Sequence, residues 1–330
     1  MDANRKIFVA GPASAARQAI VRRLKIAGLS SAQIDTWEDY ELDLCDQAVM
    51  RSYLQESRPD QIYIVAGPWG RAQGGQGRHG RYMADALLGP VQLIHEALYA
   101  GVPKLLFVAS HQVYGGCTVL PLAEEDLAYA VPDTLRAPLA VAHTTGIRVC
   151  EAYTREFGHS LGLSYRSVVV GNVYGPGGGL DPSTAGEPLA LMRHIHQAKV
   201  FKLSSVSIRA NGLERGDWLY VDDMADGCIG VLELSDNRYR RLTQASRPQL
   251  NLGSGKACTY LELVQAVARV VGYEGQIQID GQTVERGEDF FLDTHRVRSV
   301  GWQPRVGLDT GLAHMYRDYQ QQERKLASTP

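Results

Sequence analysis

The stretch Lys104-Leu105-Leu106-Phe107-Val108-Ala109-Ser110 contains five successive apolar residues between a lysine and a serine. A short apolar run without polar alternation is typical of a strand that is buried on both faces. Strands of this kind occur mainly in parallel sheets whose two faces are covered by helices. The stretch therefore favours an α/β fold.

Similar strands and amphipathic segments alternate on both sides of this stretch. The other predicted strands are Lys6–Ala10, Gln61–Ala66 and Tyr165–Val170. The predicted helices are 13–27, 82–100 and 139–157. This alternation predicts a doubly wound parallel sheet, which is a Rossmann-like α/β fold.

The second half of the chain differs in composition from the first. A Gly/Pro-rich segment covers 175–188, and predicted helices follow at 188–197, 221–234 and 259–271. A chain of 330 residues also exceeds the usual size of one compact domain. We expect a Rossmann-like dinucleotide-binding-type domain at 1–171. A smaller lobe, mainly for substrate, is expected at 172–330, with strands that return to the main sheet.

Composition excludes several classes of protein. The formal net charge is −2 at pH 7, so no basic surface indicates a nucleic-acid partner. The polar start of the chain and the lack of a long apolar run predict a cytoplasmic protein without a membrane partner. The five cysteines are widely scattered, which argues against a disulfide framework and against a metal site.

Several motifs together resemble the extended short-chain dehydrogenase/reductases, also called the NAD-dependent epimerase/dehydratase superfamily. The resemblance extends from about Lys6 to Tyr319 and is greatest to the GDP-L-fucose synthase branch. The segments that carry it are Asn172–Pro176, Asp217–Ala225, Leu250–Gly255, Gly146–Tyr153 and Val270–Gly275. The resemblance implies an extended Rossmann-like fold and a nucleotide-sugar ligand.

The resemblance also implies a Tyr-x-x-x-Lys pair for carbonyl reduction, with both side chains on one helix face. Leu139 stands at the tyrosine position and His143 at the lysine position. Leucine cannot donate a proton, so the sequence argues against hydride chemistry. The family's epimerase pair of cysteine and histidine matches Gln112 and Gly186, with Glu187 adjacent as a possible carboxylate base.

The resemblance implies a Gly-x-x-Gly-x-x-Gly loop around the cofactor pyrophosphate. Gly11 remains, but Ser14 and Arg17 occupy the other two glycine positions. The acidic segment Asp35–Asp39 should repel the 2′-phosphate of NADPH. The cofactor therefore stays unidentified, and the sequence argues against NAD(P) binding. Vestigial cofactor contacts are predicted at four positions, namely Gly11, Asp43, Leu44 and Ala66.

A catalytic site without redox chemistry remains possible at the end of the quoted strand. Ser110, His111 and His143 are the candidates for proton transfer in an epimerase, dehydratase or lyase. Alternatively, Ser110 caps a turn and both histidines are satisfied polar residues. The substrate contacts that the resemblance implies are Asn172, Arg193, Arg215 and Arg286.

Three functions follow from these observations. The first is a nucleotide-sugar-related binding or scaffold protein without redox activity. The second is a redox-neutral enzyme on a nucleotide sugar or a related small molecule. The third is an NAD(P)-dependent epimerase/reductase of a GDP-4-keto-6-deoxy sugar. Extended members of the superfamily dimerise through two helices per subunit. The resemblance therefore implies a homodimer, or a heterodimer with a related chain, that pairs through the predicted helices 82–100 and 139–157.

Overall fold

The computed structural model describes residues 5–36, 46–67, 79–131, 138–179, 187–244, 246–281 and 289–328. Within these residues, six parallel strands form the main sheet in the order β2-β1-β3-β4-β5-β9. They are β1 (Ile7–Ala10), β2 (Ile34–Asp35), β3 (Gln61–Val65), β4 (Lys104–Ser110), β5 (Ser164–Val170) and β9 (Gln249–Leu252). The predicted doubly wound α/β fold is confirmed.

Both faces of the sheet are buried, as the apolar runs predict. Successive side chains of a strand point to opposite faces. Accordingly, Ile7 and Val9 pack in one hydrophobic cluster and Phe8 and Ala10 in another. The first cluster includes residues of α1 (Ala15–Ile26) and α6 (Val221–Glu233), and the second includes residues of α2 (Gln47–Ser57), α3 (His79–Tyr99) and α4 (Pro138–Phe157).

The helix that follows β1 begins two residues later than the sequence indicates. Ser14 has extended backbone angles, and its hydroxyl accepts a hydrogen bond from the backbone N–H of Arg17 at 3.2 Å. A serine in this position satisfies one of the unpaired amides of the first turn. Ser14 is therefore the cap of α1 and not part of the helix.

Smaller sheets from the second half of the chain stand beside the main sheet. One has the order β10-β8-β6 and the other pairs β11 with β7. Their strands are β6 (Asn172–Tyr174), β7 (Ser205–Ile208), β8 (Arg215–Tyr220), β10 (Ala257–Thr259) and β11 (Gln276–Ile279). The remaining helices are α5 (Glu187–Val200), α7 (Asp236–Leu242), α8 (Tyr260–Val271), α9 (His295–Ser299) and α10 (Leu308–Ser328), with short 3₁₀ helices at Ser31–Gln33 (η1), His111–Tyr114 (η2) and Glu124–Ala128 (η3).

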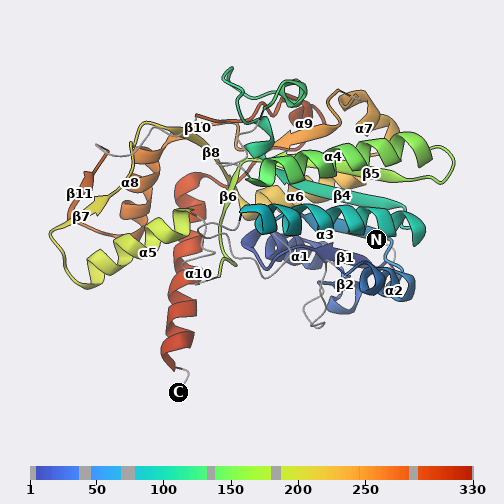
Figure 1. The fold of residues 1–330 in the computed structure, drawn as a ribbon. Helices are drawn as coiled ribbons and strands as arrows, with labels where there is room; N and C mark the ends of the chain where they lie inside the picture. Colours follow the sequence, from blue (N-terminus) through green and yellow to red (C-terminus); the bar gives the residue numbers. More distant parts are fainter. Residues whose placement is uncertain are drawn as a thin grey trace.

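The arrangement in Figure 1 places α5, α8, β7 and β11 away from the main sheet, with α10 descending beside them. β9, although late in the chain, pairs with β5 at the edge of the main sheet. The division at residue 171 stays a prediction.

No described helix combines the length and the apolar composition that a membrane span requires. Across the same described part of the chain, no group of three or more His, Cys, Asp or Glu side chains is arranged to hold a metal ion.

Candidate functional site

Ser110, His111 and His143 meet at the carboxyl end of β4. The backbone N–H of Ser110 donates to Nδ1 of His143 at 3.1 Å. Oγ of Ser110 lies 3.5 Å from Nδ1 of His111 and accepts from the backbone N–H of Gln112 at 3.4 Å. The structure therefore brings the three candidate catalytic residues together, and Ser110 also caps η2.

The state of His143 limits what it can do. The residue is 2% exposed, and burial lowers its pKa to about 4, so the ring is neutral at pH 7. Because Nδ1 accepts a hydrogen bond, the single proton of the neutral ring is on Nε2. Nε2 is buried and has no hydrogen-bond partner in the described part of the chain. His143 can therefore donate a hydrogen bond through Nε2, but the lone pair of Nδ1 already accepts the Ser110 amide.

His111 is covered by an aromatic ring from a distant part of the chain. Its ring stacks on Phe290 with a centroid distance of 3.6 Å and an interplanar angle of 5°. Burial and the neighbouring His143 lower the pKa of His111 to about 3. Nothing in the local sequence indicates this contact, because Phe290 lies in an irregular segment far along the chain.

The resemblance relates three other positions to catalysis, and two of them lie within the described residues. Leu139 is half-buried and lies one helical turn before His143 in α4. Gly186 lies outside the described residues. Glu187 begins α5 and contacts the hydroxyl of Tyr260 on α8, and burial raises the pKa of Glu187.

The glycine that remains after β1 has a backbone that requires it. Gly11 has φ +133°, and a Cβ at this position would collide with the carbonyl oxygen of Val65. A left-handed φ with this close approach excludes other residues. Gly11 therefore preserves the tight turn between β1 and α1.

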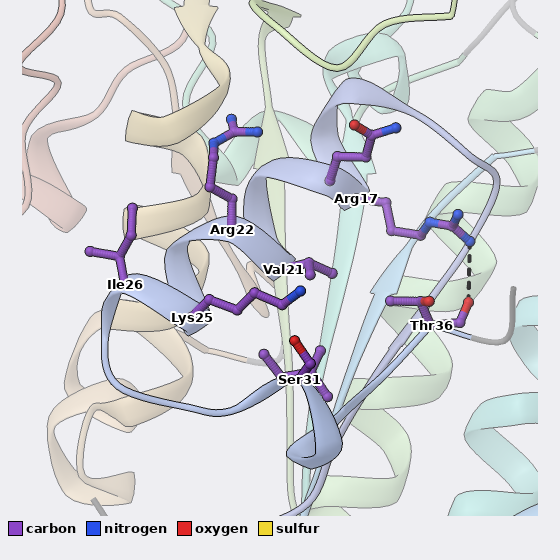
Figure 2. A pocket seen from close by; sticks show the side chains of 9 residues that line it. Arg17, Val21, Arg22, Lys25, Ile26, Ser31 and Thr36 are labelled. Atoms are coloured by element: carbon purple, nitrogen blue, oxygen red, sulfur yellow. Dashed lines mark hydrogen bonds between the residues drawn. The ribbon is translucent and has the colours of Figure 1, made fainter.

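Arg17 extends across the carboxyl ends of two neighbouring strands. It is 6% exposed, and its Nη1 donates to the carbonyl of Gly11 at 3.0 Å and to the carbonyl of Thr36 at 3.2 Å (Figure 2). Gly11 directly follows β1, and Thr36 directly follows β2. Open α/β sheets bind ligands at such strand ends. The side chain therefore fills space on the ligand-binding edge, and does not only add bulk between helix and strand.

A cavity of about 550 Å³ follows the outer side of α1 below this contact. Figure 2 shows the guanidinium groups of Arg17 and Arg22 pointing in different directions, with Lys25 between them near Ser31. Arg22 forms an ion pair with Asp222 on α6. Two of the three cations that line this cavity, Arg17 and Arg22, are thus already engaged with other groups.

The remaining vestigial cofactor positions contribute little to a described site. The backbone N–H of Ala66 donates to the carbonyl of Val108 at 3.0 Å, so it is used within the sheet. Asp43 and Leu44 lie outside the described residues. Asp35, in the acidic segment, accepts a hydrogen bond from the hydroxyl of Tyr53.

The predicted substrate contacts are spread over several elements. Asn172 is half-buried in β6, and Arg193 lies on α5 beside Tyr319 of α10. Both Nε and Nη2 of Arg215 donate to one carboxylate oxygen of Asp289, at 3.2 and 3.1 Å. The fork of Arg215 is therefore already occupied by a carboxylate. Arg286 lies outside the described residues.

Comparison with known proteins agrees with this architecture. A family model described as "NAD dependent epimerase/dehydratase family" matches residues 9–242. GDP-L-fucose synthase of Escherichia coli (strain K12) is 31% identical over 94% of this chain and 95% of its own length. GDP-L-fucose synthase 1 of Arabidopsis thaliana is 32% identical over 96% of this chain and 94% of its own.

A solved structure extends the likeness. The Campylobacter jejuni protein MlghC, described as a GDP-mannoheptose C4 reductase with NADP bound, superposes with a TM-score of 0.82. It is 25% identical, and the match covers 97% of this chain and 99% of that chain. This chain belongs to the NAD-dependent epimerase/dehydratase family of extended short-chain dehydrogenases/reductases, and the expected similarity to GDP-L-fucose synthase is confirmed.

Proposed function

We propose that this protein binds a nucleotide sugar and does not transfer a hydride. In this proposal it acts as a binding or scaffold member of its family, as a homodimer or paired with a related chain. The cytoplasm is the compartment we propose for it. α3 and α4 are the helices that the family resemblance implies for pairing, and the molar mass in solution tests that pairing.

The first turns of α4 carry the proposal. Carbonyl reduction needs a proton donor beside the carbonyl oxygen, and the two residues in register are Leu139 and His143. Leu139 has no proton to give. His143 is neutral, uses Nδ1 to accept the Ser110 amide and has a pKa of about 4, so it does not supply the positive charge of a lysine.

The dinucleotide loop supports the same conclusion. Ser14 caps the amide of Arg17, and the Arg17 guanidinium bridges the ends of β1 and β2. A dinucleotide at this edge would need the close backbone approach that glycines provide. It would also have to displace two hydrogen bonds from a buried guanidinium.

The sugar-nucleotide part of the proposal comes from the relatives. The names of the two curated relatives refer to GDP-L-fucose, and that of the Campylobacter protein refers to GDP-mannoheptose. Asn172, Arg193 and Arg286 are the residues we propose for this ligand. Arg215 would contribute only if the ligand replaced Asp289.

Calorimetric titration with NADPH, NAD, GDP and GDP-mannose, each separately, tests the proposal. We expect heat of binding from the GDP compounds, none from the dinucleotides, and no oxidation of NADPH in the presence of a GDP-4-keto sugar. Micromolar binding of NADPH by the wild-type chain would refute the non-redox assignment. Silence from all four compounds would refute the sugar ligand and leave a search for a protein that co-purifies in stoichiometric amount.

A matched variant makes the dinucleotide result interpretable. Ser14→Gly combined with Arg17→Gly restores both missing glycines, and we expect it to gain measurable affinity for NADPH or NAD. The thermal midpoint of the variant must be checked, because glycine inside a helix costs about 1 kcal/mol. A folded variant that still ignores both dinucleotides would show that Arg17 is not what excludes them.

A redox-neutral enzyme is the second candidate, since Ser110, His111 and His143 do lie together. Their geometry favours it, but the lowered pKa values of both histidines disfavour general acid catalysis near neutral pH. If an epimerase, dehydratase or lyase activity is found, His143→Ala should abolish turnover while the protein stays folded. Turnover that survives the change would exclude His143 as the acid or base.

A further inference from the structure

A second cavity, of about 660 Å³, lies between β10, α8 and the segment that leads into α10. None of the candidate site residues that the structure describes lines it. Cys258, Ala266, Val306 and Leu308 give it an apolar part. Four cationic side chains line the rest: Lys256, Arg269, Arg298 and Arg305.

The carboxylates near this cavity are mostly engaged elsewhere. Glu262 is its single acidic lining residue among those described, and Oε2 of Glu262 accepts from the backbone N–H and hydroxyl of Thr259 at 2.7 and 2.9 Å. This is the capping box at the start of α8. Asp309 pairs with Arg269 at 3.0 Å, which neutralises one of the four cations.

Three cations remain without an ion pair among the described residues. Lys256 is exposed, and Arg298 makes one long hydrogen bond, 3.4 Å, to the carbonyl of Ser254. Arg305 contributes its backbone N–H to Asp223 at 3.0 Å, and the same oxygen accepts from the backbone N–H of Val306 at 2.8 Å. The Asp223 carboxylate is therefore held by backbone amides.

Trp218 adds a second feature to the cavity wall. Its side chain comes from β8, and the residue is 9% exposed. The indole Nε1 is buried beside Gly216 and the ring of Phe290, which do not line the cavity, and it has no hydrogen-bond partner among the described residues. A ligand in the cavity therefore does not meet this donor, and Trp218 serves only as a fluorescent reporter in the cavity wall.

We propose that this cavity binds a multiply charged organic phosphate of about mononucleotide size. Its volume falls within the range of about 300–1,000 Å³ that is usual for small-molecule sites. Arginine and lysine side chains are the groups that recognise phosphate oxygens in proteins. The site is separate from the ends of β1, β2 and β4, so it does not depend on the nucleotide sugar proposed above.

The cavity along α1 differs from this one in how far its cations are already engaged. It also contains cations, but Arg17 donates to two carbonyls and Arg22 pairs with Asp222, which leaves Lys25 (Figure 2). An anion there would have to displace contacts that already exist. The cavity beside Trp218 offers its charges without that cost.

Titration with inorganic pyrophosphate at low salt tests this proposal by calorimetry and tryptophan fluorescence. We expect saturable binding, and the double variant Lys256→Gln/Arg298→Gln should weaken it at least tenfold, since it removes two charged hydrogen-bond donors. Lys25→Gln is the matched control and should leave the affinity unchanged. Trp218→Phe should remove the fluorescence change while the calorimetric binding persists.

Three outcomes would overturn the proposal. One is the absence of pyrophosphate binding at millimolar concentration. The second is an equal loss of affinity in Lys25→Gln and in the double variant, which would indicate a nonspecific charge effect. The third is binding that Arg193→Gln abolishes and the double variant retains, which would place the phosphate at the proposed sugar-nucleotide site. The first two outcomes do not bear on whether GDP-mannose binds, and the third would support the sugar-nucleotide site while it refutes this one.

Discussion

At the scale of single residues, the surroundings of His143 change the acid–base properties that a histidine ordinarily has. The sequence suggests a histidine for proton transfer, since its ordinary pKa is near neutrality. In the fold, burial lowers the pKa to about 4 and the Ser110 amide takes the basic nitrogen. His143 is therefore a neutral hydrogen-bond donor. The alternative that both histidines are satisfied polar residues holds for Nδ1 of His143, which accepts from Ser110, but not for Nε2.

His143→Gln tests this state through the pH dependence of stability. The unfolded chain binds a proton on His143 below pH 6.5, whereas the folded chain excludes it until about pH 4. The stabilisation is therefore present above pH 6.5 and is lost as the pH falls toward 4. Between pH 7 and pH 5, the wild type should lose about 2 kcal/mol more free energy of unfolding than the variant.

Urea unfolding at the two pH values measures this difference. Glutamine keeps an acceptor for the Ser110 amide, so the comparison isolates the titration. The exposed His159, changed to glutamine, is the control for replacing a histidine at the surface. Equal losses of stability in the wild type and in His143→Gln would show that His143 titrates normally.

At the scale of elements, the close packing of α4 against β4 positions the candidate site. Gly146, on α4, lies against Phe107 of β4, and a Cβ at this glycine would collide with the phenyl ring. This close approach brings His143, one turn earlier on α4, within reach of the Ser110 amide. The helix and the strand were both predicted from periodicity, but their separation follows from side-chain volume.

Gly146→Ala should therefore destabilise the protein by about 1–3 kcal/mol, because an added methyl group in a packed interior forces neighbouring groups to shift. Gly230 in α6 is the matched control, since no described atom lies within 4 Å of its Cβ position. Gly230→Ala should stabilise by up to about 1 kcal/mol through helix propensity alone. Guanidinium unfolding of both variants measures the two effects, and a neutral Gly146→Ala would contradict the tight contact.

At the scale of the whole molecule, the segment 289–293 connects parts that are far apart in sequence. The backbone N–H of Leu122 donates to the carbonyl of Phe291, and the backbone N–H of Asp293 donates to the carbonyl of Leu122, both at 2.8 Å. Beside this contact, the buried carboxylate of Glu124 pairs with Arg296 at 2.5 Å. Together these contacts hold Phe290 over His111.

Arg296→Met should lower the free energy of unfolding by about 3 kcal/mol, because it removes the ion-pair partner of the buried Glu124 carboxylate and also the pair with the more exposed Glu125. The double variant Glu124→Gln/Arg296→Met should recover part of this loss. The exposed pair of Arg269 and Asp309 provides the control, and Arg269→Met should cost less than about 1 kcal/mol. Similar losses in the two arginine variants, measured by urea unfolding, would contradict a special role for the buried pair.

The sequence by itself determined the class of the fold, four of the six strands of the main sheet and the resemblance to the family. Apolar periodicity depends on neighbours a few residues apart, and motifs such as Asn172–Pro176 are local, so both can be read without coordinates. The sequence also shows which residues occupy the tyrosine and lysine positions of the family, and their spacing of i and i+4 places Leu139 and His143 on one helix face.

Tertiary structure alone decided how these residues are arranged chemically. The stacking of Phe290 on His111, the pairing of Asp289 with Arg215 and the contact of Arg17 with Thr36 join segments that are not neighbours in the chain. Burial and hydrogen bonding, which set the pKa of His143, also depend on what surrounds it after folding. Local sequence patterns carry no information about such distant contacts, and this is why the cavity beside Trp218 was not predicted.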